Sequence, residues 1–196
     1  LMISAAAPAS EQERRQYLHW ALSARVDGMV LNRVRLDDWR VQILMEHAIP
    51  FVTLGVCPGC IDCPRVEVDD TRAFQDLVAL LVSKGHRRIA YVGGPDYLVI
   101  QAARQQGYQR GLELARIKVS SALIESGDLT EEGGYQAALR LLRLPEPPTA
   151  IIGINDTTAL GVLKALHSQS INPGGEVAVA GYDGIKETEI SNPRLT

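Results

Sequence analysis

The sequence predicts an α/β fold in which parallel sheets are covered by helices on both faces, and three observations support this prediction. Short β-type apolar runs alternate along the chain with longer stretches that have the periodicity of an amphipathic helix. The short runs are almost continuously apolar, which is typical of parallel strands buried on both faces. Most of them end in Asn, Asp or Gly, residues that turn a chain or cap the helix that follows.

The first third of the chain contains two predicted helices and three predicted strands. Ser10 and Glu13 have the spacing of a capping box, and the apolar residues behind them follow one helical face, namely Tyr17, Leu18, Ala21 and Leu22. Asp37 and Asp38 begin a second helix. The predicted strands are residues 29–31, 50–54 and 66–68.

The remaining two thirds repeat this alternation more regularly. Asp69 and Asp70 head a helix that ends at Lys84 and Gly85, a basic last turn followed by a glycine. Further helices are predicted over residues 102–115, 131–144 and 157–168, and the prolines at 145–148 prevent the second of these from continuing. The predicted strands are residues 88–92, 122–124, 149–152 and 177–180.

The composition is that of an ordinary globular protein. The chain has 196 residues, of which 46% are hydrophobic and 22% charged, with a net charge of −3. No apolar run approaches the roughly 18 to 20 residues needed to cross a bilayer. The apolar start, Leu1 to Ser4, is too short for a secretory signal and lacks basic residues, so we expect a cytoplasmic location. The mildly acidic charge disfavours DNA binding by this part of the protein.

Polar residues and glycines follow nearly every predicted strand. Because the carboxyl ends of parallel strands meet at one edge of a sheet, these residues predict a binding site for a polar ligand there. They are Asn32, Arg33, Gly55, Gly93, Gly94, Asp96, Gly127, Asp128, Asn155, Asp156, Tyr182 and Asp183. Helix capping is an equally good explanation for Asp128 and Asp156 taken singly.

An enzymatic function is not predicted. The sequence has no GxGxxG, no Walker A lysine and no GxSxG motif, and none of its four histidines stands beside a candidate nucleophile. Acidic residues are present, but no activated nucleophile or metal cluster accompanies them. The sequence therefore favours ligand binding over catalysis, with no catalytic residue, cofactor or resident metal.

All three cysteines, Cys57, Cys60 and Cys63, lie in one CxxCxxC stretch. This spacing resembles part of a zinc or iron–sulfur site, but such a site needs a fourth ligand, and no further cysteine or suitably spaced histidine supplies it. A loop with incidental thiols is the favoured interpretation. One pair is also free to form an adventitious disulfide, and a metal or redox protein remains an alternative.

Several motifs together resemble the effector domains of the lactose/galactose repressor family. They are KGHRRIAYVGGP at residues 84–95, RxxGY at 104–108, PTA at 148–150, NDxxALG at 155–161, VAVAGYD at 177–183 and PxLT at 193–196. VDG at 26–28 and IP at 49–50 match earlier family positions. The order and spacing of the motifs extend the resemblance over essentially the whole chain.

The resemblance implies a periplasmic binding protein-like fold, with two doubly wound parallel-sheet subdomains and the effector in the cleft between them. It assigns residues 1–67 to an incomplete N-terminal subdomain and 68–190 to the C-terminal subdomain. Residues 191–196 then begin a crossover back. The helix-turn-helix head, the hinge helix and the first strand-helix unit of the family are not in this sequence.

The resemblance also implies the effector-binding residues. Arg104 matches the arginine that grips effector hydroxyls, and Asn155 and Asp183 match the amide and carboxylate that contact the effector. A buried arginine needs an acidic partner, so we expect Arg104 to pair with Asp183. Gly55 replaces a carboxylate of many relatives, and Leu129 replaces a stacking aromatic, a role for which Tyr97 is the substitute candidate.

The implied function is that of the ligand-sensing domain of a bacterial transcriptional repressor. The expected partners are a small polar effector, a sugar in the first place, operator DNA through the absent head, and a second copy in a homodimer. No membrane partner is expected. A periplasmic sugar receptor of a transporter shares the fold and is the main alternative.

Overall fold

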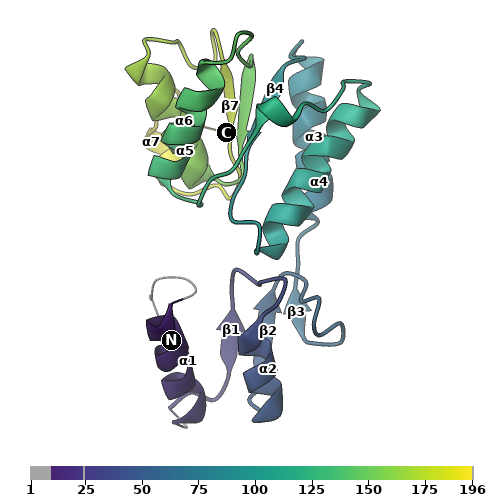
Figure 1. Cartoon of the computed structure of the whole chain (residues 1–196), viewed down its shortest axis with the longest axis vertical. Coiled ribbons are helices and arrows are strands. Elements are labelled where there is room, and N and C mark those ends of the chain that lie inside the picture. Colours follow the sequence, from purple (N-terminus) through teal and green to yellow (C-terminus); the bar gives the residue numbers. More distant parts are fainter. Residues whose placement is uncertain (1–9, 24, 196) are drawn as a thin grey trace. The chain divides into compact units, whose positions relative to one another are not determined.

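The computed structural model describes residues 10–23 and 25–195, and it divides into two compact units, Leu1–Val68 and Asp69–Thr196. We refer to them as unit 1 and unit 2 and describe each separately (Figure 1). The apolar start at residues 1–4 and the last residue of the PxLT motif lie outside the described residues. In the described part of the chain, no helix is long and apolar enough to span a membrane.

Unit 1 is a small parallel sheet with two helices. Its elements are α1 (Glu11–Leu22), β1 (Met29–Leu31), α2 (Trp39–Glu46), β2 (Phe51–Leu54) and β3 (Arg65–Val66). The strands are parallel in the order β1-β2-β3. Leu31 and Thr53 are paired on a buried face. On the other face, Val30 is 66% exposed and Val66 is 62% exposed, so the described elements cover one side of this sheet only.

Unit 2 contains a four-stranded parallel sheet in the order β5-β4-β6-β7. Its strands are β4 (Ile89–Val92), β5 (Ile124–Glu125), β6 (Ala150–Gly153) and β7 (Ala178–Ala180). Its helices are α3 (Asp70–Ser83), α4 (Val99–Leu114), α5 (Glu131–Leu142), α6 (Asp156–Ser168) and the short α7 (Glu187–Ile190). The predicted α/β class is confirmed.

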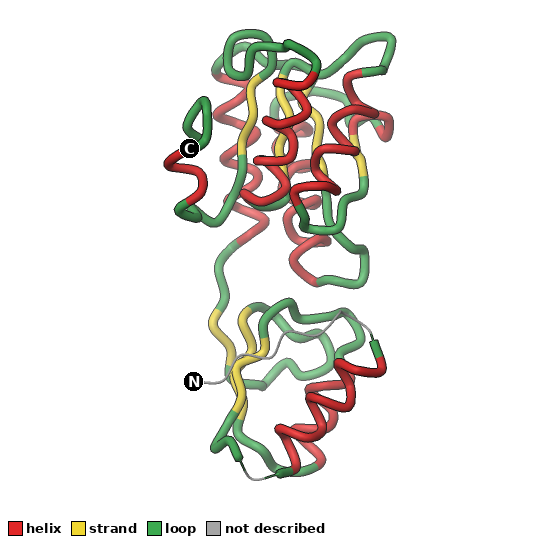
Figure 2. Tube along the Cα trace, turned by 90° about the vertical axis from the view of Figure 1, so that its left-hand side faces the viewer, coloured by secondary structure: helices red, strands yellow, loops and turns green. Residues whose placement is uncertain are grey.

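The side chains of β4 alternate between two hydrophobic cores. Ile89 and Tyr91 pack with Phe74 of α3 and Tyr108 of α4, whereas Ala90 and Val92 pack with the residues of α5 and α6. Because successive side chains of a strand point to opposite faces, one helix pair covers each face of the sheet. Figure 1 shows α3 and α4 on one side of the strands and α5 and α6 on the other, and in the view of Figure 2 helices overlie the strands of this unit.

Two sequence expectations need correction in detail. Residues 122–123 were expected in a strand, but they belong to a 3-10 helix, Ser121–Leu123, and the strand begins only at Ile124. The strand expected at 66–68 is displaced to Arg65–Val66. The Ser10–Glu13 spacing does mark the start of α1, since the Ser10 hydroxyl accepts from Glu13 N at 3.0 Å, and the Glu13 carboxylate also binds Arg35.

Glycines allow the helices of each pair to approach closely. A Cβ on Gly161 of α6 would overlap the Glu131 carbonyl oxygen of α5, and one on Gly134 would overlap the Thr158 carbonyl oxygen. A Cβ on Gly107 of α4 would likewise overlap the Thr71 carbonyl oxygen of α3. Backbone on both sides of these contacts leaves no flexible atom to move aside, so small residues set the separation of the helices.

We expect Gly161→Ala to lower the free energy of unfolding of unit 2 by about 1–3 kcal/mol, because the added methyl group forces α5 and α6 apart. Chemical denaturation followed by circular dichroism measures this change. Lys164→Ala, on the exposed side of the same helix, is the matched control and should change stability by less than about 1 kcal/mol. Equal stability of Gly161→Ala and the unsubstituted chain would contradict the close packing.

Candidate functional site

The carboxyl edge of the unit 2 sheet carries a buried arginine. Arg104 lies on α4 and its residue is only 7% exposed. Its guanidinium reaches the segments that follow β6 and β7, so it lies where ligands bind in open α/β sheets. This edge is therefore the candidate site in unit 2.

Three polar groups surround the Arg104 guanidinium. Its Nε donates to the Asp70 carboxylate at 2.9 Å, and its Nη1 donates to the Ile154 carbonyl oxygen at 2.6 Å. Its Nη2 lies 3.7 Å from an Asp183 carboxylate oxygen. The predicted proximity of Arg104 and Asp183 is present in the structure, and a stronger partner, Asp70, accompanies it.

Aromatic rings complete the surroundings of this cation. The Arg104 guanidinium carbon lies 4.2 Å from the centroid of the Tyr182 ring and 5.6 Å from that of Phe74. Burial raises the pKa of the Tyr182 phenol, and the negative charge of Asp70 raises it further, so the ring is neutral at physiological pH. A cation held over such a face gains electrostatic stabilisation that is larger where water is excluded.

Asp70 was not among the residues predicted for the site. The sequence placed Asp69 and Asp70 together at the head of a helix, but only Asp69 caps it, accepting from Arg72 N at 2.9 Å. Asp70 is thereby left to bind Arg104 across 34 residues of sequence. A helix start needs only one capping carboxylate, and the second acid of the pair was the signal for another role.

Asp156 holds the segment that presents Asp183. Its carboxylate accepts from Gly184 N at 2.6 Å and Ile185 N at 2.9 Å, and its backbone N–H donates to the Tyr182 carbonyl oxygen at 2.8 Å. Asp183 has a φ of 118°, a conformation that side-chain-bearing residues rarely adopt. Asp156 is 4% exposed and does not cap α6, so the capping interpretation of this residue is wrong.

Asn155 caps α6 itself, because its side-chain oxygen accepts from Thr158 N at 2.9 Å. This bond orients the amide at the carboxyl end of β6, next to the carbonyl oxygen of Ile154 that Arg104 binds. Asp128 likewise is not the cap of α5, a position that belongs to Thr130. Hydrogen bonding by the Thr130 hydroxyl lowers the pKa of the Asp128 carboxyl.

The other predicted residues of unit 2 differ in accessibility. Leu129 is 7% exposed with a φ of 69°, whereas Tyr97 is 42% exposed. Gln101, which was not predicted, is buried at this edge, where its side-chain oxygen accepts from Tyr91 Oη at 3.0 Å and Gly94 N at 2.8 Å. It fixes the glycine turn that follows β4.

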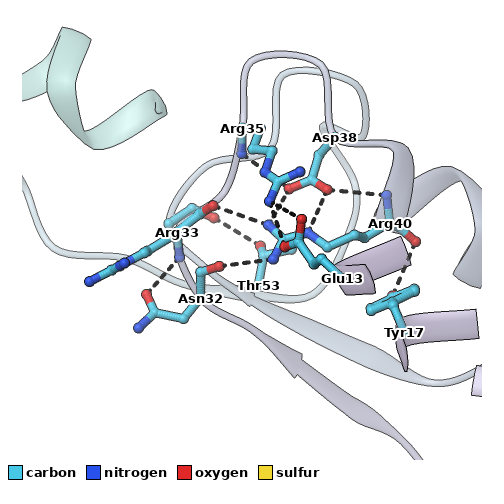
Figure 3. Close-up of polar contacts among 9 residues, drawn as sticks. Glu13, Tyr17, Asn32, Arg33, Arg35, Asp38, Arg40 and Thr53 are labelled. Atoms are coloured by element: carbon cyan, nitrogen blue, oxygen red, sulfur yellow. Dashed lines mark hydrogen bonds and ion pairs between the residues drawn. The ribbon is translucent and has the colours of Figure 1, made fainter. Parts of the chain in front are cut away.

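The carboxyl ends of β1 and β2 in unit 1 hold a second polar cluster, shown in Figure 3. Arg35 pairs with Glu13 at 2.6 Å, and Arg40 pairs with Asp38 at 2.6 Å. Arg40 also donates to the carbonyl oxygens of Asn32 and Arg33, at 3.3 and 3.0 Å. These bonds fix the loop after β1.

Gly55, the predicted site residue of unit 1, directly follows β2 with a φ of 108°, which favours glycine. Its carbonyl oxygen accepts from Thr53 Oγ1 at 2.8 Å.

The Asp38 carboxyl is buried, and its ionisation depends on Arg40. Burial alone raises the pKa of Asp38, but hydrogen bonding and the charge of Arg40, with the N–H groups of Arg35 and Arg40, outweigh it. The net pKa is therefore below the usual 3.8. The carboxylate form is the one that stabilises unit 1.

Comparison with known proteins places this architecture in a family. The family model of the periplasmic binding protein-like domain matches residues 78–196. The HTH-type transcriptional regulator AglR of Rhizobium meliloti is 33% identical over 178 residues, covering 90% of this chain and 50% of that protein.

Solved structures show the same relationship. A putative LacI transcriptional regulator from Bacillus cereus subsp. cytotoxis superposes with a TM-score of 0.90 at 29% identity, over 97% of this chain and 68% of that one. The transcriptional regulator CelR, in complex with cellobiose, superposes with a TM-score of 0.84 at 30% identity, over 95% of this chain and 57% of that one.

The fold and the polar edge of unit 2 define a periplasmic binding protein-like domain. A regulatory protein of the LacI family from Chloroflexus aggregans is 31% identical over 98% of this chain and 69% of that one, with a TM-score of 0.83. More particularly, the chain therefore belongs to the LacI family of transcriptional regulators, as the resemblance of its motifs implied. It spans about half the length of the curated relatives that it matches.

We expect Asp156→Ala to free the segment that carries Asp183, because two backbone N–H groups lose their shared acceptor. The free energy of unfolding of unit 2 should fall by roughly 2 kcal/mol or more, and amide exchange at Gly184 and Ile185 should accelerate. Asp156→Asn, which keeps one acceptor oxygen, should show a smaller change in both. Unchanged exchange at these amides in Asp156→Ala would contradict the positioning role.

We expect unit 1 to lose stability as the pH falls from about 4 through the lowered pKa of Asp38. A carboxyl with a lower pKa in the folded state contributes stability above its unfolded value, and protonation removes that contribution. Denaturation at a series of pH values between 2.5 and 6, roughly the range in which carboxylates titrate, measures it. Asp38→Asn should be less stable at neutral pH, and its free energy of unfolding should change less with pH in this range. Asp37→Asn, at the exposed neighbouring residue, should behave like the unsubstituted chain.

Proposed function

We propose that unit 2 forms the effector-binding surface of a transcriptional regulator, and that the effector is a small, neutral, hydroxyl-rich molecule such as a sugar. The observation that carries this proposal is the buried Arg104, whose guanidinium is shared by Asp70, Asp183 and a backbone carbonyl at the carboxyl edge of the sheet. An effector hydroxyl that accepts from Arg104 and donates to Asp183 uses both members of this pair.

The charge balance favours a neutral effector over an anionic one. One positive charge, on Arg104, faces two carboxylates, Asp70 and Asp183, so the group has a net charge of −1. A phosphate or carboxylate of an effector entering here would meet a cation that is already neutralised and an additional negative charge. A hydroxyl group meets no such repulsion, since it both donates and accepts.

Asp70 and Asp156 have positioning roles in this proposal. Asp70 fixes the direction of the guanidinium, and Asp156 fixes the segment of Asp183. Asn155 and Asp183 contact the effector with Arg104, and the neutral Tyr182 ring, stacked on Arg104, supplies an apolar surface. Gly55, Leu129 and Tyr97 remain candidate contacts. Tyr97 has the exposure of a ring that can stack on a sugar.

One solved relative favours a sugar as the effector class. CelR, which shares 30% identity and the fold of this chain, has been solved with cellobiose, a neutral disaccharide. The resemblance implies a carboxylate in many relatives at the position of Gly55 and a stacking aromatic in several at the position of Leu129, so the individual sugar bound by this chain is expected to differ from theirs. The effector is therefore assigned as a class, namely neutral hydroxylated molecules.

The whole protein is proposed to be a cytoplasmic, homodimeric repressor that binds operator DNA through a helix-turn-helix head. The names of AglR and of the LacI regulators favour this assignment over a periplasmic receptor. The effector acts by binding one conformation of the protein more tightly than another, since only differential affinity shifts an equilibrium. It is bound and released unchanged, without catalysis.

We expect isothermal titration of the chain against neutral mono- and disaccharides, and against their phosphates, to show binding of a neutral sugar only. Asp183→Asn should weaken that binding by about 10- to 100-fold, because a charged hydrogen-bond acceptor is lost. Arg104→Ala should abolish it. Arg110→Ala, at an exposed position of the same helix, is the matched control and should bind normally.

The outcomes separate the parts of the proposal. Binding of the phosphates alone would overturn the charge argument and leave an effector site in place. No binding of either class by folded protein would overturn the sugar assignment. Asp183 is 42% exposed at its side chain, so Asp183→Asn tests the site without the risk to folding that removal of the buried Arg104 carries.

A further inference from the structure

The loop between β2 and β3 gathers all three cysteines of the chain into two consecutive turns. Cys60 N donates to the Cys57 carbonyl oxygen at 3.0 Å, across Pro58 and Gly59. Cys63 N donates to the Cys60 carbonyl oxygen at 3.3 Å. The second turn places Cys60 and Cys63 at a Cα separation of 5.4 Å, within the range of disulfide geometry, and their sulfurs are bonded.

The three cysteine residues differ in accessibility. Cys57 is 3% exposed and Cys63 is 7% exposed, while Cys60 is half-buried. Thiol–disulfide exchange requires access of an external sulfur to one of the pair, and Cys60 is the more exposed residue of the two. Cys57 is a buried thiol outside the pair, and its burial keeps it from reacting with the external disulfide in place of Cys60 or Cys63.

The disulfide is expected to contribute little to the stability of unit 1. It joins residues only three apart in sequence, and the stabilisation expected from a cross-link decreases with the length of the loop that it closes. The loop is already held without it. Thr53 N donates to the Pro64 carbonyl oxygen at 3.0 Å, and Gly55 N donates to the Val66 carbonyl oxygen at 2.8 Å. Arg65 also donates to the Ile61 carbonyl oxygen at 2.6 Å.

We propose that Cys60 and Cys63 form a reversible dithiol–disulfide site that exchanges with low-molecular-weight disulfides of the glutathione type. A bond that contributes little to stability and joins one cysteine that is only half-buried is suited to being made and broken. A CxxC pair in a protein of a reducing compartment points to the same chemistry. The inference rests on the cytoplasmic location proposed above, but it is independent of effector binding, because it concerns unit 1 alone.

The exchange balances in two steps. The Cys60 thiolate attacks one sulfur of the external disulfide, forming a mixed disulfide and releasing one external thiolate. The Cys63 thiolate then attacks the Cys60 sulfur, closing the protein disulfide and releasing the second external thiolate. Two electrons pass from the two cysteines to the external disulfide, and the two protons lost by the protein thiols are taken up by the released thiolates.

The structural consequence is expected at the carboxyl end of β2. Gly55 begins the cysteine loop and is bound to Thr53 and Val66 on either side. Opening the disulfide removes one restraint on the second turn, residues 60–63, and leaves the hydrogen bonds from Cys63 N to the Cys60 carbonyl oxygen and from Arg65 to the Ile61 carbonyl oxygen. Amide exchange in this turn should be faster in the reduced protein than in the oxidised protein.

The experiment equilibrates the chain, without oxygen, in buffers of varied ratio of reduced to oxidised glutathione, then quenches it in acid. Free thiols are labelled with a maleimide under denaturing conditions and counted by mass spectrometry. We expect one transition from three labels to one as the buffer becomes oxidising, and a return to three on reduction. Cys57→Ser should change from two labels to none, with the same midpoint.

The cysteine variants give the matched controls. Cys60→Ser and Cys63→Ser should show no paired loss of thiols at any glutathione ratio. Three labels throughout the series would overturn the proposal, as would a disulfide that peptide mapping assigns to Cys57. Stoichiometric zinc in anaerobically purified protein would also overturn the proposal in favour of a thiolate metal site, if each of the three serine variants lost that zinc.

Discussion

The placement of one buried positive charge organises the candidate site of unit 2. A guanidinium removed from water is costly unless its donors are satisfied and its charge is balanced. Arg104 meets this requirement with groups from three places in the sequence: Asp70 at the head of α3, Ile154 after β6 and Asp183 after β7. The requirement therefore fixes how these segments meet, and the polar edge is organised before any ligand enters.

The two units balance buried charge differently. In unit 1, Glu13 neutralises Arg35 and Asp38 neutralises Arg40, so the polar cluster there serves to hold a loop. In unit 2, two carboxylates share one arginine, which leaves acceptor capacity at the edge of the sheet. Such excess capacity is what a ligand rich in hydroxyl donors requires.

The supporting contacts show why the site needs the whole of unit 2. The Asp156 carboxylate holds the strained backbone of Asp183 by accepting from the two N–H groups that follow it. The Asn155 side-chain oxygen caps the start of α6. The close approach of α5 and α6 at Gly161 sets the position of that helix start. A change in helix packing at Gly161 is thereby transmitted to Asn155, and through Asp156 to the segment of Asp183.

The sequence by itself determined the α/β class, the order of nearly all elements and the polar strand end at Asp183, because apolar periodicity and strand-end polarity are local signals. Arg104 became a candidate only through the resemblance of its motif to the repressor family. It did not determine which of two adjacent acids does which task. Asp69 caps and Asp70 binds Arg104, and Asp156 anchors a loop where Asn155 caps. Those roles depend on which distant backbone and side chains arrive beside each carboxylate, and only the tertiary structure decides that.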